Sequence, residues 1–259
     1  MRRVLPNRKV VMAAFDRGQV PRIACINKAT VDLEVDFDRL IPALQKFLDA
    51  HFVPVWGTPA TLVKAARPLA GAWSMVFLDD ADAANALGYH DLTKNALPLA
   101  KIFVRTTLAA RQKVSVTACH ELAEMMVDPA INLWADGPNA SLYAYEMCDA
   151  VEEDEFAIDG IAMSDFVYPA YFEGFRGAGS TRFDHLGLLT RPFELRKGGY
   201  SLVRRGDKVT QIIGSPAKAR RFAREDRAMH RSEYRKAAMK DALRKLRAQT
   251  ARANLKPSG

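Results

Sequence analysis

The chain has 259 residues, of which 49% are hydrophobic and 26% charged, a composition typical of a globular protein with a sizeable core. Its apolar runs are short and interrupted by charges, so no stretch approaches the ~20 residues of a membrane helix and no span is predicted. The net charge of +8 originates in residues 215–259, which hold fourteen Lys and Arg against four Asp and Glu, so the remaining chain is slightly acidic.

The first residues carry the positive charge of a signal peptide, but their apolar stretch is interrupted at residues 7–9 (Asn, Arg, Lys), so we expect no cleavage. The three cysteines, Cys25, Cys119 and Cys148, are far apart in sequence and form neither a paired framework nor a CxxC clamp. Together these features favour a cytoplasmic location, where thiols stay reduced.

Strand and helix patterns alternate through the first half of the chain. Residues 20–26, "VPRIACI", are typical of a strand, and residues 37–50 of a helix with one apolar face. Three further short runs rich in Val, Phe and Trp are expected as strands: "FVPVW" (52–56), "WSMVFLDD" (73–80) and "AKIFVRT" (100–106). The next element is a helix over residues 115–128, discussed below.

After Asp128–Pro129 the sequence becomes irregular and aromatic, through "SLYAYEMCDAVEEDEF" and "SDFVYPAYF". Residues 198–214 then predict a β-hairpin that turns at Gly206–Asp207. The whole pattern predicts an α+β fold, with a small mixed sheet, a motif-bearing helix and an irregular C-terminal part.

A domain boundary is expected at residue 214. There Gly214 ends a strand, Ser215 can cap a helix, and Pro216 suits the first helical position. We therefore divide the chain into residues 1–214 and a basic helical tail, residues 215–259. The tail has a thin apolar stripe, so it is either a solvated arm or an electrostatic contact for nucleic acid or another acidic partner.

The stretch "SVTACHELAEMMVDP", residues 115–129, gathers polar groups on one side of the predicted helix. Measured as rotation around the helix axis from His120, Glu124 lies at about 40°, Asp128 at about 80° and Glu121 at about 100°. A helix with a solvated acidic face would have this pattern too. Yet the stripe has no cation, and the Glu124–Asp128 repulsion costs stability unless a positive ion compensates.

A metal ion gives each of these positions a role. Side chains four residues apart on a helix reach a common point, so His120 and Glu124 can be ligands of one ion. Glu121 lies to the side, where it can act as general base towards a water activated by the ion. Cys119 is turned away from His120 and is expected in the core.

The motif "HELAE" resembles the HExxH helix of the zincin metallopeptidases, with glutamate in place of the second histidine, and "KIFVRT" resembles a strand of the small sheet before that helix. The likeness covers roughly residues 20–172. The chain is also similar to a group of uncharacterised bacterial and phage proteins, through "HELAEMMVDP", "EMCD" and "SDFVYP". The resemblance implies a zincin-like fold, a bound metal and a peptidase-like activity.

The gluzincin branch of the zincins implies a third ligand, a glutamate beyond the motif helix, and an aspartate that supports the site. Glu146 has that position in "YEMCD", and Asp149 can hydrogen-bond a ligand. Asp128 and Asp149 itself remain competitors for the third ligand. His90, His185, Tyr168 and Tyr171 could also reach an active cleft and stabilise an oxyanion, but we interpret each as a partly buried polar residue.

Two functions follow. The first is a metal-dependent hydrolase of a peptide or other amide bond, with Zn²⁺ as the expected ion by resemblance. A ligand set of one histidine and two carboxylates makes Mn²⁺ or Fe²⁺ alternatives and weakens the Lewis acidity of the ion. The second is a non-catalytic, phage-related or chromosome-associated protein that keeps a structural metal and binds acidic partners through its tail.

Overall fold

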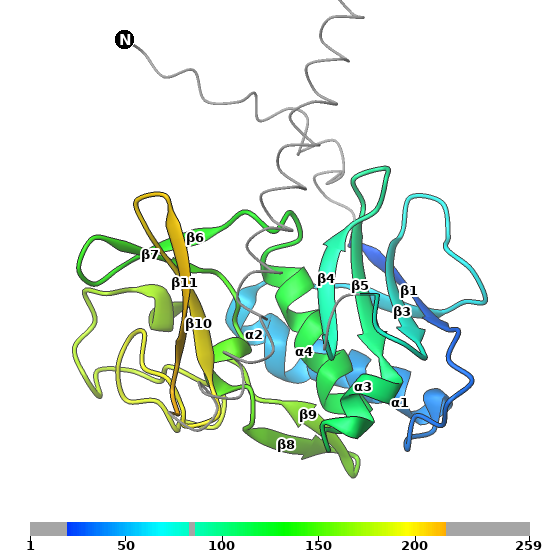
Figure 1. The fold of residues 1–259 in the computed structure, drawn as a ribbon. Coiled ribbons are helices and arrows are strands. Elements are labelled where there is room, and N and C mark those ends of the chain that lie inside the picture. The colour runs from blue at the N-terminus through cyan, green and yellow to red at the C-terminus, as the bar shows by residue number, and fades with distance from the viewer. Residues whose placement is uncertain (1–19, 83–85, 216–259) are drawn as a thin grey trace, which may run out of the picture.

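A computed structural model describes residues 20–82 and 86–215, so the predicted basic tail lies outside the described residues from Pro216 onward. The described part is an α+β fold built from a five-stranded mixed sheet, a four-stranded antiparallel sheet, one hairpin and a few helices (Figure 1). In this part of the chain no helix is long and apolar enough to cross a membrane.

The larger sheet has the strand order β2-β1-β3-β5-β4. Its strands are β1 (Arg22–Asn27), β2 (Thr61–Lys64), β3 (Trp73–Leu78), β4 (Gly88–Leu92) and β5 (Pro98–Phe103). All pairs are parallel except that β4 runs antiparallel to β5. The four central residues of β1 are fully buried, as expected for a strand inside a parallel sheet with both faces covered.

The predicted first helix is present as α1 (Phe37–Phe47), which begins where the Asp36 carboxylate accepts a hydrogen bond from the Asp38 amide at 2.8 Å. The expected strand at residues 52–56 is wrong. The helix continues through a π-helical turn (Leu48–Phe52) into α2 (Val53–Trp56). The run "FVPVW" has strand-forming residues, but tertiary packing decides its conformation, since Phe52 is fully buried and the Trp56 indole donates to the Val167 carbonyl at 3.1 Å.

After β5 the short helix α3 (Val104–Ala109) leads into α4 (Val114–Val127), the motif helix. All residues of α4 from Val114 to Met126 are buried. The helix contacts β4 and β5 on one side and β9 (Ile161–Ser164) on another. The motif helix therefore lies at the centre of the molecule rather than on its surface (Figure 1).

The C-terminal part contains more strand than we expected. Residues 134–164 form four strands of four residues each: β6 (Trp134–Gly137), β7 (Ser141–Ala144), β8 (Glu155–Ile158) and β9. Such short strands leave no room for a clear alternation of apolar and polar residues. The hairpin β10 (Tyr200–Arg205) and β11 (Lys208–Ile213) is confirmed, with Gly206 in the left-handed conformation, and it joins β7 and β6 in the second sheet.

One continuous hydrophobic core connects the larger sheet, α4 and the C-terminal part. The three cysteines are all buried and free, and Cys119 is fully buried in this core, as expected from its place on the motif helix. Two short 3₁₀ turns, at Asp149–Val151 and Pro169–Phe172, complete the described fold.

Candidate metal centre

Six titratable side chains meet around the middle of α4. One comes from β4, three from α4 and two from the segment that follows β7: His90, His120, Glu121, Glu124, Glu146 and Asp149. They include two imidazoles and four carboxyl groups, and they come from parts of the chain up to 59 residues apart, from His90 to Asp149.

All six residues are buried. Their exposed fractions range from 0% for Asp149 to 6% for His90 and His120. The solvated acidic face, one interpretation of the sequence, is therefore wrong. Burying carboxylates is costly unless positive charge or hydrogen bonds compensate, so this cluster requires a physical explanation.

The first group consists of His120, Glu124 and Asp149, whose ligand atoms lie within 4.8 Å of one another. His120 Nε2 is 3.2 Å from Glu124 Oε1 and 3.3 Å from Asp149 Oδ1. The first contact follows from the four-residue spacing on one helix turn. The second joins α4 to the first residue of the 3₁₀ turn Asp149–Val151.

Electrostatics favour positive charge at this position. Burial alone would lower the pKa of His120, but the neighbouring carboxylates of Glu124, Asp149 and Glu121 together raise this pKa well above its usual value. Without a metal, the group therefore holds a protonated imidazole between carboxylates. A divalent cation would satisfy the same field with neutral histidine as a ligand.

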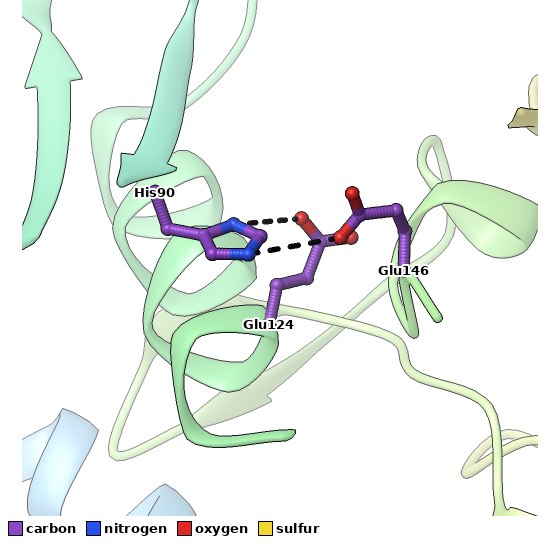
Figure 2. A group of neighbouring side chains, drawn as sticks. All are labelled: His90, Glu124 and Glu146. Carbon is purple, nitrogen blue, oxygen red and sulfur yellow. Dashed lines mark ion pairs between the residues drawn. The ribbon is translucent and has the colours of Figure 1, made fainter. Parts of the chain in front are cut away.

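The second group consists of His90, Glu124 and Glu146. Figure 2 shows the His90 imidazole directed between the two carboxylates. Its Nδ1 atom is 3.7 Å from Glu124 Oε2, and its Nε2 atom is 3.8 Å from Glu146 Oε2. Glu124 thus turns one oxygen towards His120 and the other towards His90.

Glu121 reaches the same place from the next position on α4. Its Oε2 atom is 3.7 Å from His90 Nδ1, and its side chain lies against the backbone of Gly88 in β4. A Cβ atom on Gly88 would lie 2.8 Å from Glu121 Cγ, closer than such atoms approach. Glycine at position 88 is therefore what allows Glu121 to lie between α4 and β4.

Within the described residues, buried polar atoms of the cluster make no hydrogen bond with acceptable geometry, among them His90 Nε2, His120 Nε2 and Glu121 Oε2. His120 Nε2 is close to two carboxylate oxygens but is not aimed well at either. Buried polar atoms are nearly always hydrogen-bonded in proteins, and exceptions often mark an ion site. The donor set of imidazole nitrogen and carboxylate oxygen suits a divalent transition metal.

The residues expected from the sequence are distributed over both groups. Asp149, expected to support a ligand, belongs to the first group with His120 and Glu124, whereas Glu146, our expected third ligand, belongs to the second group with His90. Asp128 has a structural role, because its two carboxylate oxygens accept the Asn132 and Leu133 amides at 2.9 Å each. These bonds close the turn after α4.

Among the other candidates, His90 was expected as a partly buried polar residue. It is instead buried, 6% exposed, and lies within the cluster. No spacing in the sequence relates position 90 to the motif, and its strand was not predicted. His185 forms a separate group, with its Nε2 atom 3.0 Å from His51 Nδ1 and its Nδ1 atom 3.2 Å from the Tyr168 hydroxyl. Tyr171 is a core residue, 1% exposed.

Comparisons with protein-family models, curated proteins and solved structures find no match to this chain. The function proposed for this chain therefore rests on the geometry of the six side chains.

Proposed function

We propose that the protein is a metal-dependent hydrolase of a peptide or other amide bond. His120, Glu124 and Asp149 hold the ion, and Glu121 is the general base. The observation that carries the proposal is the buried His120–Glu124–Asp149 group, with Glu121 adjacent to His120 on the same helix. Asp149 here takes the ligand role that the sequence suggested for Glu146.

A divalent ion in this group supplies two things to amide hydrolysis: a water of lowered pKa and polarisation of the substrate carbonyl. The chain supplies the proton transfers. Glu121 accepts the proton of the attacking water and passes it to the leaving nitrogen. Its Oε2 atom makes no hydrogen bond within the described residues, so it has capacity for that proton.

The ligand set limits the choice of ion. Glu124 and Asp149 together neutralise a divalent cation, so its water is less acidic than with two histidines. Zinc remains the first choice because of the resemblance of "HELAE" to the zincin motif, with Mn²⁺ or Fe²⁺ as alternatives.

A zincin-like fold and a cytoplasmic location are part of this proposal. Support for the fold is the mixed sheet β1–β5, which precedes the motif helix in the chain and packs β4 and β5 against it. Support for the location is the set of buried, free cysteines.

The decisive variant is Glu121→Gln, which keeps the size of the side chain but cannot accept a proton. We expect unchanged metal content and a fall in peptide-library hydrolysis of about 10²–10⁴-fold. Glu34→Gln, at an exposed position, is the matched control and should retain full activity. Hydrolysis by Glu121→Gln at the wild-type rate would remove Glu121 as base.

One observation favours a second function, a non-catalytic protein with a structural metal. All six side chains are at most 6% exposed, and structural metal sites are closed to solvent. Nucleic acid or another acidic partner would then bind residues 215–259, which lie beyond the described residues except for Ser215. This function predicts no hydrolysis by the wild type and loss of partner binding when residues 216–259 are deleted, with metal content unchanged.

A further inference from the structure

We propose that the centre binds two divalent cations, bridged by Glu124. His120 and Asp149 complete the first site, and His90 and Glu146 complete the second. The inference rests on the metal centre of the proposed function, because Glu124 is common to both sites. It goes beyond that function by assigning a second ion and its ligands.

The two oxygens of Glu124 face different histidines. Oε1 is 3.2 Å from His120 Nε2, whereas Oε2 is 3.7 Å from His90 Nδ1. A carboxylate in this position can bind one ion through each oxygen, and paired metal sites in enzymes hold their ions about 3.5–4 Å apart. The geometry of Glu124 is therefore that of a bridging ligand.

The second site has ligand spacings that fit one ion. Metal–ligand bonds of about 2.0–2.2 Å place two ligands of the same ion at most about 4.3 Å apart. One atom each from His90, Glu124 and Glu146 lies within 4.8 Å of the others, close to this limit. His90 approaches Glu124 through Nδ1 at 3.7 Å and Glu146 through Nε2 at 3.8 Å, and an ion binds one of these two nitrogens. Both distances exceed that of a hydrogen bond, so the imidazole is directed towards the carboxylates without bonding to them (Figure 2).

The charge of the cluster also suits more than one ion. Four carboxyl groups, those of Glu121, Glu124, Glu146 and Asp149, are buried together. One divalent ion balances two of them and leaves two buried negative charges beside His90. A second divalent ion removes this excess and leaves both histidines neutral, the form in which imidazole binds a metal.

A buried, unpartnered atom marks the second site independently of the acidic residues. His90 Nε2 makes no hydrogen bond, although His90 is only 6% exposed. One imidazole and carboxylate oxygens form a ligand set that suits first-row transition metals, with Mn²⁺ and Zn²⁺ as the natural candidates. Manganese is also the better probe, because two neighbouring Mn²⁺ ions couple magnetically.

The test uses the full-length chain, stripped with a chelator and reloaded with Mn²⁺ alone. After gel filtration, elemental analysis should give two ions per chain, and electron paramagnetic resonance should show a spin-coupled pair. His90→Gln and Glu146→Gln should each reduce the content to one ion and give the spectrum of an isolated ion. His185→Gln, at a histidine outside the cluster, should keep two coupled ions.

Each alternative result overturns the inference in a distinguishable way. The first alternative is one ion per chain that is lost in Asp149→Asn but kept in His90→Gln. His90 would then be an ion-pair partner only, and the proposed hydrolase function would still stand. Two ions that persist in both His90→Gln and Glu146→Gln would place the second ion elsewhere. No bound ion in the wild type would remove the proposed function as well. Circular dichroism shows whether a variant folds. If either His90→Gln or Glu146→Gln fails to fold, the metal content of the other variant tests the second site.

Discussion

Within the described residues, buried carboxyl groups gather in two places with different surroundings. In the pair Asp165 and Asp184, both fully buried, backbone amides bond three of the four oxygens. Asp184 accepts the amides of Leu188 and Leu189 at 2.8 Å each, and Asp165 Oδ1 accepts those of Phe166 and Leu186 at 2.8 and 3.1 Å. In the candidate metal centre, the carboxylates of Glu121, Glu124, Glu146 and Asp149 face two imidazoles, and the Cys148 amide donates to Glu124 Oε1 at 3.3 Å.

The pair Asp165 and Asp184 also differs from the candidate metal centre in how its negative charge is reduced. Burial, followed by the charge of Asp184, raises the pKa of Asp165 to about 8, so the pair holds a proton at neutral pH. The pair thereby reduces its own repulsion without an ion. The comparison teaches that buried acidity alone does not identify a metal centre. The candidate centre differs from the pair in its imidazoles and in its buried nitrogens, which make no hydrogen bond within the described residues.

The largest difference between the two places should appear in metal binding. Glu124→Gln removes the charge common to both proposed sites, and we expect apparent affinity for Mn²⁺ or Zn²⁺ to fall by more than about 100-fold. Asp184→Asn makes the same chemical change in the other pair and should bind metal as the wild type does. Calorimetric titration of the stripped proteins measures both. An equal loss of metal affinity in Glu124→Gln and Asp184→Asn would show that the two groups of carboxyl groups do not differ in metal binding.

The next effect concerns folding stability. Asp184→Ala leaves the part-buried amide of Leu188 and the buried amide of Leu189 without their acceptor, which should lower the free energy of unfolding by about 2–5 kcal/mol. Metal content per folded chain should not change. Urea denaturation gives the free energy, and a loss below about 0.5 kcal/mol would show that these bonds are replaced by water or by backbone movement.

The smallest effect, when it is expressed per pH unit, is a pH dependence of the free energy of unfolding. Because Asp165 has its pKa raised from 3.8 to about 8, the folded state keeps a proton that the unfolded chain releases in this interval. The contribution of Asp165 to stability therefore falls as pH rises from 3.8 to 8, by about 1.4 kcal/mol per pH unit. Asp165→Asn should remove this slope. Parallel stability curves for wild type and variant between pH 5 and 7.5 would contradict the protonated pair.

The periodicity of the helix was sufficient to predict one contact of the candidate centre. The four-residue spacing of His120 and Glu124 predicts that they meet, and they do so at 3.2 Å. The choice between Glu146 and Asp149 could not be made in the same way. Both lie in a short segment, and the 3₁₀ turn at Asp149–Val151 directs Asp149 towards His120.

The sequence by itself determined the α+β class, the motif helix on which His120 and Glu124 meet, and the hairpin that turns at Gly206, because each depends on neighbours within a few residues. The tertiary structure alone decided that α4 is buried, that "FVPVW" is helical, and that His90 joins Glu124 and Glu146. These outcomes depend on how β4 and the segment after β7 pack against α4, and contacts between distant segments leave no periodic signal in a single chain.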